Sequence, residues 1–377
     1  MKEFSLYIHI PFCVKKCNYC DFNSYAAPEL IPSYVEALQQ EISFYNNRYV
    51  SRQVKTIYIG GGTPTLLNEK DLKSLIKCIR QNFKIKSGAE FTIEANPGTL
   101  NLEKLLLLKD LGVSRLSLGL QAFQEKLLKL MGRIHSAKEF EESFRTARQA
   151  GFDNINVDVI FGLPEQTVSD FMETIEYVAG LSPEHISCYS LTVEEGTVFH
   201  KWQKQGLLKL PVEDEERAMY HKAAEYLKRR GFVHYEISNF AKPGRMCRHN
   251  VACWEYEDYL GLGAGAHSFM DGFRFYNHLS PQEYIICLAQ KKLPSAETEH
   301  INVRDQQAEF CFLGLRLIDG LDKEAFKERF GKDIHQIYGA AIEKLSASGL
   351  IEENDRHLKL TSRGLDLANE VFIEFLP

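Results

Sequence analysis

Three cysteines near the start of the chain have the spacing of a metal-cluster site. Cys13, Cys17 and Cys20 lie in the segment HIPFCVKKCNYCDF, as C-x-x-x-C-x-x-C. Thiolates bind soft metals and iron–sulfur clusters, so three of them on one loop can hold three irons of a four-iron, four-sulfur cluster. The fourth iron then stays open for another ligand, as in catalytic metal sites. The alternative is a zinc site with His9 as the fourth ligand.

A second group of ligand-type residues lies between Cys247 and Trp254. The imidazole of His249 is a competent axial ligand for heme iron, and the indole of Trp254 can stack on a porphyrin. Cys253 is a further soft ligand, and Cys247, His249 and Cys253 alternatively have the donor types of a zinc site. There is no C-x-x-C-H, so covalent heme attachment of the usual kind is not predicted.

The elements that must position these residues alternate between strands and helices. Extended segments are expected at 4–10, 56–59, 90–95, 114–120, 154–161 and 185–192, and the segments 68–83, 101–112 and 136–151 have helical periodicity. The last of these helices opens with Ser136 and Glu139, the spacing of a capping box, and ends at Gly151. This alternation predicts six parallel strands joined by right-handed crossovers, as an open sheet or a complete or partial barrel.

Side-chain parity along the strands predicts a polar interior. Alternate residues point to opposite faces of a sheet, and one face collects apolar residues such as Leu6, Ile8 and Ile10, which we expect to meet the helices. An ordinary eight-stranded barrel fills its interior with branched apolar side chains, so a polar interior suits a polar ligand. An antiparallel sheet with one wet face is the alternative, and the helical connections argue against it. The polar face collects Tyr7, His9, Thr92, Glu94, Asn96, Ser117, Gly119, Gln121, Asn154, Asn156 and Asp158.

The pattern changes after Leu210. A helix at about 214–230 and a strand-like HYEIS precede a glycine-rich, aromatic stretch from Gly244 to Phe275. After Gln306, short helices lead to Gly349, a hairpin turn at 354–355 and a final helix, which is typical of a winged-helix unit. Its helices are not notably basic, which favours scaffolding or partner contact over DNA binding. We predict a partial barrel at 1–235, a connecting region with the heme-motif candidate at 236–300, and a mainly helical, winged-helix-like domain at 301–377.

The composition of the 377 residues is that of a globular protein, with 44% hydrophobic and 25% charged residues. The net charge of −6 gives no global attraction to nucleic acid or anionic lipid, so a nucleic-acid partner is not expected. No stretch approaches the ~18 apolar residues of a membrane span, which leaves only peripheral membrane contact. The N-terminus lacks a signal-peptide cleavage site, and nine cysteines do not form a disulfide framework. We therefore expect a cytoplasmic protein with reduced thiols.

The cysteine triplet, with Tyr19 before its last cysteine, resembles the radical S-adenosylmethionine (SAM) superfamily. In that superfamily the amino and carboxylate groups of SAM chelate the open iron, and an electron from the cluster cleaves SAM to a 5′-deoxyadenosyl radical. The turn GGGTPT, Gly60 to Thr65, follows the second strand, where such turns expose backbone N–H groups to an anionic group, here the SAM carboxylate. The resemblance implies a TIM-like partial (β/α)6 barrel, a 4Fe–4S cluster, SAM, and an electron donor such as a flavodoxin or ferredoxin.

Further motifs narrow the resemblance to the branch of the anaerobic coproporphyrinogen III oxidases (HemN) and the HemW heme chaperones. They are YIHIPFC, GGGTPT, EANPGTL, SLGLQAF, GRIH, NVDVIFGLP and CRHN…W. The resemblance implies that Tyr19 packs by the adenine. Carboxylates suit ammonium and ribose hydroxyl groups, and Arg133 suits a carboxylate. In that branch SAM is contacted by the residues that match Tyr7, Gly61, Gly62, Thr63, Glu94, Gln121, Arg133 and Asp158.

Two departures from the oxidases favour the chaperones. Phe22 stands where the oxidase carries a further cysteine, and only six residues precede Tyr7, where the oxidase has a longer segment. The chaperone motif H-N-x-x-Y-W is present as H-N-V-A-C-W, with Cys253 in place of tyrosine. The resemblance implies a chaperone that binds heme at His249 and passes it to an acceptor protein. The alternatives are an oxygen-independent coproporphyrinogen III oxidase and a related radical SAM methyltransferase.

Overall fold

The computed structural model describes residues 2–46 and 48–377. Its main body is a 12-stranded sheet in the order β12-β11-β10-β9-β1-β2-β3-β4-β5-β6-β8-β7, and within the described chain the edge strands β12 and β7 do not pair with each other. The six neighbouring strands β1–β6 are parallel, which confirms the predicted α/β fold with a partial barrel. These strands are β1 (Glu3–Ile10), β2 (Gln53–Gly61), β3 (Ile85–Ala95), β4 (Arg115–Gln121), β5 (Ile155–Phe161) and β6 (His185–Ser190).

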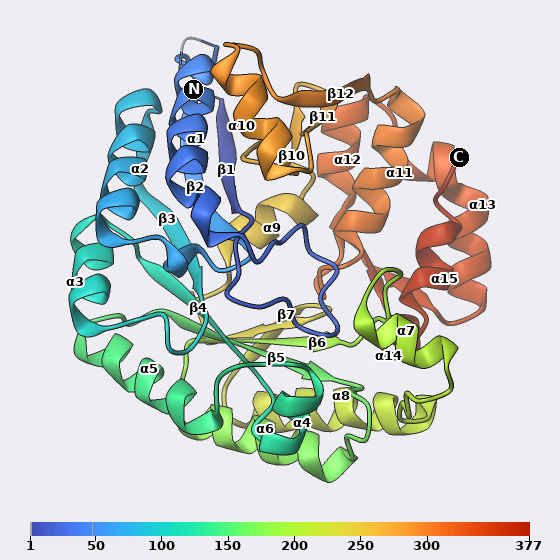
Figure 1. Cartoon of the computed structure of the whole chain (residues 1–377). Helices are drawn as coiled ribbons and strands as arrows, with labels where there is room; N and C mark the ends of the chain where they lie inside the picture. Colours follow the sequence, from blue (N-terminus) through green and yellow to red (C-terminus); the bar gives the residue numbers. More distant parts are fainter. Residues whose placement is uncertain (1, 47) are drawn as a thin grey trace.

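Helices between these strands cover the outer face of the curved sheet (Figure 1). The capping box predicted at the start of α5 is present, because Ser136 and Glu139 each bond the other's backbone N–H. Asn68 and Asn101 cap α2 and α3 in the same way with their side-chain oxygens. The helices are α1 (Ile31–Tyr45), α2 (Glu69–Asn82), α3 (Leu102–Asp110), α4 (Glu125–Leu130), α5 (Ala137–Gln149) and α6 (Val168–Gly180), with short 3₁₀ turns η1 (Pro28–Leu30) and η2 (Pro64–Leu66).

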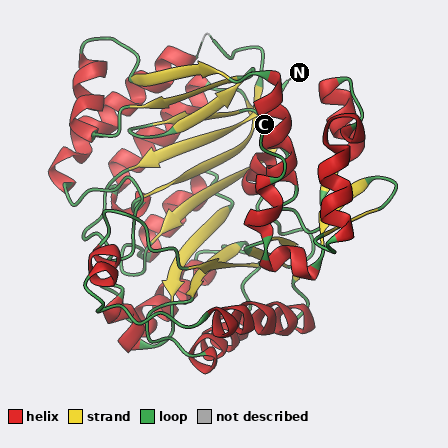
Figure 2. Cartoon of the chain, turned by 90° about the vertical axis from the view of Figure 1, so that its right-hand side faces the viewer, coloured by secondary structure: helices red, strands yellow, loops and turns green. Residues whose placement is uncertain are grey.

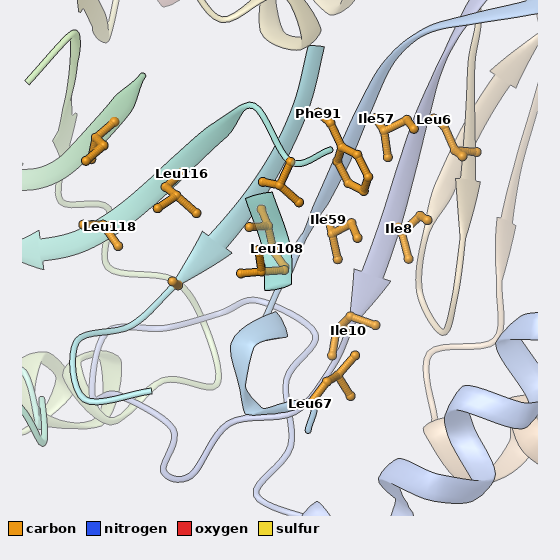
Figure 3. Packing of buried hydrophobic residues seen from close by; sticks show 14 of the residues in the cluster. Leu6, Ile8, Ile10, Ile57, Ile59, Leu67, Phe91, Leu108, Leu116 and Leu118 are labelled. Atoms are coloured by element: carbon orange, nitrogen blue, oxygen red, sulfur yellow. The ribbon is translucent and has the colours of Figure 1, made fainter. Parts of the chain in front are cut away.

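The apolar face of the strands forms the main core, as the parity argument predicts. Leu6, Ile8 and Ile10 of β1 have no exposed surface, and neither does Leu108 of α3, which packs on the same face (Figure 3). Burying each such side chain contributes about 1.5–3 kcal/mol to folding. The helices therefore take the apolar side of the sheet and leave the polar side facing inward.

Further strands extend both edges of the parallel sheet, and Figure 2 shows all of them side by side in one twisted sheet. β8 (Asn239–Ala241) and β7 (Val233–Glu236) continue from β6, and β9 (Tyr259–Leu262) pairs in parallel with β1. The short helix α9 (Arg248–Trp254) lies on the concave side (Figure 1). The remaining elements here are β10 (His267–Met270), β11 (Phe273–Asn277), β12 (Ser295–His300), α7 (Val198–Lys204), α8 (Glu213–Arg229) and α10 (Pro281–Ala289).

The C-terminal segment is mainly helical, its three-stranded sheet has the order β13-β15-β14, and its apolar residues share a core with Tyr256 and Phe269. The hairpin of β14 and β15 turns at 354–356, which confirms the hairpin predicted there. Among the described residues, no helix is long and apolar enough to cross a membrane. The elements are α11 (Val303–Gly314), β13 (Leu321–Asp322), α12 (Lys323–Phe330), α13 (Ile334–Ala347), β14 (Ile351–Glu353), β15 (His357–Leu360), α14 (Ser362–Asp366) and α15 (Ala368–Ile373).

Candidate functional site

A cavity of about 380 Å³ opens at the carboxyl ends of the parallel strands, under the cysteine loop. Parallel barrels build their chemistry at this end, because the loops that follow the strands converge there. Tyr7 and Thr63 are not part of the cavity wall. The predicted site residues that line the cavity are Cys13, Cys17, Tyr19, Cys20, Gly61, Gly62, Glu94, Gln121, Arg133 and Asp158.

The cysteine loop is anchored to the barrel and receives hydrogen bonds at its sulfur atoms. Asn18 donates from its side chain to the backbone oxygen of Leu130 at 2.8 Å, which fixes the middle of the loop. Thr63 Oγ1 donates to Cys13 Sγ at 3.6 Å, and Arg133 donates to Cys17 Sγ at 3.7 Å. Donors of this kind stabilise thiolate ligands, so these two residues support the sulfur atoms on the side of the cavity.

Both zinc alternatives are wrong for this structure. Among residues 2–46 and 48–377, no three His, Cys, Asp or Glu side chains lie close enough together to hold one metal ion, so Cys247, His249 and Cys253 do not form a zinc site. His9 has both ring nitrogens occupied, Nδ1 by Tyr7 Oη at 2.9 Å and Nε2 by the backbone oxygen of Asn23 at 2.8 Å. In a four-iron cluster each cysteine binds a different iron. The three cysteines therefore do not have to lie close enough together to bind one metal ion.

Glu94 is held at the cavity wall by two donors. Tyr58 Oη donates to Oε1 at 2.8 Å, and the backbone N–H of Gly61 donates to Oε2 at 3.0 Å. Burial, together with the negative charge of Asp158, raises the pKa of Glu94 to about 7. A cation in the cavity would favour the ionised carboxylate, because it would offset both effects.

Asp158 is the second carboxylate of the cavity. Its oxygens accept from Asn156 Nδ2 at 2.8 Å and from Ser117 Oγ at 2.9 Å, and burial raises its pKa. Because Glu94 and Asp158 are both fixed in position and both poorly solvated, the strands β3 and β5 together present an electronegative wall. Such a wall suits ammonium groups and hydroxyl donors.

Arg133 and Gln121 offer hydrogen-bond donors, which suit a negatively charged group of a ligand. Arg133 Nη2 donates to Asn96 Oδ1 at 2.8 Å and to the backbone oxygen of Gly119 at 2.9 Å, whereas its Nε is buried without a partner. Gln121 has φ 71°, beside a register shift between β4 and β5. Bulges of this kind re-aim side chains at strand ends, and here the side chain of Gln121 lines the cavity. Both side chains suit a carboxylate.

The GGGTPT turn does not offer its backbone N–H groups to a ligand, so that prediction is wrong. Gly61 donates to Glu94, Gly62 to the oxygen of Ile10 at 2.9 Å, and Thr63 to the oxygen of Phe12 at 2.8 Å. The glycines are needed instead for close packing, because a Cβ on Gly61, with φ 114°, would lie 2.6 Å from the His9 ring. The turn thus positions Glu94 and Thr63 and contributes a flat wall.

His249 lies beneath the cavity, at the floor of the barrel interior. It is 6% exposed, its Nδ1 is 2.8 Å from Thr56 Oγ1, and its ring centroid is 5.1 Å from that of Tyr58. Burial, and then the nearby Arg115, lower the pKa of His249 to about 3, so the imidazole is neutral. Glu90 fixes the start of α9 by accepting the backbone N–H groups of Arg248 and His249, each at 3.1 Å.

The other candidate residues lie around these two regions. Tyr7 faces the floor, 6.5 Å from the His249 ring, and Tyr19 lines the cavity against Phe199. The ring of Trp254 lies 4.3 Å below the guanidinium of Arg316 from the C-terminal unit, and its Nε1 is buried without a partner. The structure therefore brings the cluster candidates and most of the SAM candidates together around the cavity, whereas Tyr7, a predicted SAM residue, lies beside His249.

Sequence reasoning missed several cavity residues, and one of them, Tyr58, follows from the strand pattern. Tyr58 lines the cavity and donates to Glu94, and it alternates with the buried Ile57 and Ile59 along β2. The same parity that placed Glu94 and Asp158 inward places Tyr58 inward too. Tyr189, at the end of β6, is a second cavity residue found only in the structure.

Comparison with known proteins identifies the family. Residues 7–178 match the radical SAM superfamily and residues 301–367 match the HemN C-terminal domain. The heme chaperone HemW of Bacillus subtilis is 41% identical over 99% of both chains, and that of Escherichia coli is 32% identical over 99% of this chain and 98% of the other. The solved structure of coproporphyrinogen III oxidase (HemN) from Escherichia coli has a TM-score of 0.86 at 24% identity, covering 99% of this chain and 90% of that chain, and so shares the fold. This chain therefore belongs to the HemW heme chaperone family of the radical SAM superfamily.

Proposed function

We propose that this protein binds heme and passes it to an acceptor protein, on a scaffold that also binds a 4Fe–4S cluster and SAM. The observation that carries the proposal is the similarity over 99% of the chain to a protein named as a heme chaperone. The site agrees with it, because a cavity that includes Glu94, Asp158 and Arg133 lies under the cysteine triplet and a neutral imidazole lies below that cavity.

The residues of the loop fit an iron–sulfur cluster. Cys13, Cys17 and Cys20 would hold it, and Thr63 and Arg133 already direct donors at two of the three sulfur atoms. When bound, the cluster supplies an electron and an open iron to the SAM beside it. Phe22 is 64% exposed at the cavity mouth and brings no further sulfur to the loop. We expect reduction by a flavodoxin or ferredoxin in the cytoplasm.

The cavity wall fits SAM. The buried Nε of Arg133 has no partner in the protein, and a ligand carboxylate would satisfy it. Glu94 and Asp158 would accept from the amino group of SAM and from the ribose hydroxyls, and Gln121 can donate or accept beside them. Tyr19 would pack by the adenine. The positive charge of the SAM sulfonium would also favour the ionised form of Glu94, whose pKa is about 7.

His249 would ligate heme iron through its neutral imidazole, with Trp254 against the porphyrin. In this structure the ring is enclosed, so heme binding requires α9 to leave the floor of the barrel. This movement breaks the hydrogen bond between His249 and Thr56, which costs about 1 kcal/mol of free energy. The protein would therefore hold heme in an open state and protect His249 in a closed state, which suits a carrier that must also release its cargo.

The experiment is an anaerobic hemin titration of the cluster-reconstituted protein, followed by absorbance. A Soret shift is expected for the wild-type chain and for His267→Ala, an exposed histidine on β10, and a much weaker one for His249→Ala. An unchanged titration of His249→Ala would remove the proposed ligand. In a second arm the protein is incubated with SAM, dithionite and coproporphyrinogen III, and conversion to protoporphyrinogen IX would establish the oxidase instead.

A further inference from the structure

One side chain connects the SAM cavity with the floor of the barrel. Tyr58 is inward-facing on β2, and its hydroxyl donates to Glu94 Oε1 at 2.8 Å in the cavity wall. The ring of the same residue lies 5.1 Å from the His249 ring with an interplanar angle of 35°. Tyr58 therefore contacts both a proposed SAM residue and the proposed heme ligand.

We propose that Tyr58 couples the two sites, so that SAM in the cavity holds α9 closed over His249 and opposes heme binding. This inference rests on the proposed function, and it assigns Tyr58 as a positioning residue that acts through Glu94 and His249. Tyr58 and His249 meet because α9 packs against β2. The two elements are far apart in sequence, since Thr56 and His249, which are in contact, are 193 residues apart.

The contacts around His249 leave Tyr58 little freedom. Thr56 and Tyr58 are two residues apart on the inward face of β2, and they hold the imidazole by a hydrogen bond and by a ring contact. Tyr7 packs beside both rings, with its ring centroid 6.2 Å from that of Tyr58 and 6.5 Å from that of His249. Interiors are closely packed and transmit strain. If the Tyr58 ring moves, the His249 ring must therefore move with it.

The sign of the coupling follows from the hydrogen bond to Glu94. The positive charge of the SAM sulfonium in the cavity favours the ionised form of this carboxylate, and an ionised acceptor forms a stronger hydrogen bond with the Tyr58 hydroxyl. The Tyr58 ring is then fixed where it covers His249, and α9 is harder to displace. Hemin needs α9 displaced, so SAM lowers hemin affinity, and by linkage hemin lowers SAM affinity by the same factor.

The test is a hemin titration of the reconstituted protein with and without saturating SAM, with no reductant so that SAM is not cleaved. SAM is expected to weaken hemin binding by roughly fivefold or more in the wild-type chain, the lower range of known couplings. Tyr58→Phe keeps the ring and removes the bond to Glu94, so the two affinities should become independent. Tyr284→Phe removes a buried hydroxyl bond of the same type, to Glu41 behind the sheet, and should keep the wild-type coupling.

A second measurement needs no hemin. Hydrogen exchange of the backbone amides of residues 248–254 should slow on addition of SAM in the wild-type chain and in Tyr284→Phe, and should not respond in Tyr58→Phe. Wild-type coupling that survives in Tyr58→Phe would overturn the inference. If hemin binds at His249 but SAM changes neither its affinity nor the exchange, the inference fails and the proposed function stands. If hemin does not bind at His249, the proposed function fails and the exchange experiment alone decides the coupling.

Discussion

The cavity and the barrel floor are built from the same six strands, yet they are prepared for ligands in opposite ways. The cavity is open, and it contains donors without protein partners, among them the buried Nε of Arg133. At the floor, His249 is 6% exposed, bonded to Thr56 and packed against Tyr58, and its helix is capped by Glu90.

The difference teaches which site can bind without rearrangement. A preorganised cavity with unsatisfied polar atoms gains their hydrogen bonds on binding. A satisfied and enclosed side chain must first lose its own contacts, so its apparent affinity is reduced by the small population of the open state. Ligand binding in the cavity is therefore expected to depend on the residues that line the cavity. Heme binding at the floor is expected to depend on the contacts that hold α9 in its closed position.

The largest expected effect comes from the cysteine loop. Cys17→Ser should abolish the iron–sulfur absorbance and the bound iron after anaerobic reconstitution, because serine does not replace a thiolate at a cluster with three protein ligands. Cys287→Ser changes a thiol on α10 outside the cavity and should reconstitute fully. Iron and sulfide assays check both variants, and a Cys17→Ser protein with its full iron content would refute the ligand assignment.

The next effect tests the electronegative wall. Glu94→Gln keeps the shape but removes the negative charge that the amino group and the sulfonium of SAM would meet, so SAM affinity should fall roughly 10- to 100-fold, as for other hydrogen bonds to charged groups. Equilibrium binding to the reconstituted protein measures it. Glu41→Gln is the matched control, since Glu41 is also buried with a pKa of about 7 but lies outside the cavity. Equal losses in both variants would mean that the effect is structural.

The pH dependence of SAM binding is a second test of the role of the Glu94 carboxylate. With a pKa of about 7 in the empty cavity, Glu94 is mostly protonated at pH 6 and mostly ionised at pH 7.5. Affinity for the cationic SAM should thus rise with pH, by about eightfold at most over this range, which is the ratio of the ionised fractions of Glu94 at the two pH values. The Glu94→Gln profile should be flat, and a wild-type profile that falls with rising pH would contradict the role of Glu94.

The smallest expected effect tests whether the closed contact of His249 limits binding at the floor. Thr56→Val nearly preserves shape but leaves His249 Nδ1 without its partner, which weakens the closed state by about 1 kcal/mol and should raise hemin affinity about fivefold. Thr92→Val is the control, because the buried hydroxyl of Thr92 has no hydrogen-bond partner to lose. Weaker hemin binding in Thr56→Val would show that the closed contact does not limit binding.

Most of the fold follows from local periodicity in the sequence. The six parallel strands, the capping box at Ser136 and the terminal hairpin are present as predicted, because strand parity and helix caps are written in neighbouring residues. Parity also placed Glu94 and Asp158 inward, and both line the cavity. The role of the glycine turn could not be predicted, since its N–H groups are taken by residues of β1, β3 and the cysteine loop.

The sequence by itself determined the ligand types: three thiols on one loop, two inward carboxylates and an imidazole beside an indole. Only the tertiary structure decided which of them meet. Arg133 reaches Cys17 across 116 residues, and His249 lies under Tyr58 and not beside the cysteines. The physical reason is that such contacts depend on how distant elements pack, and packing is fixed by the shape of the whole interior and not by the spacing within any one segment.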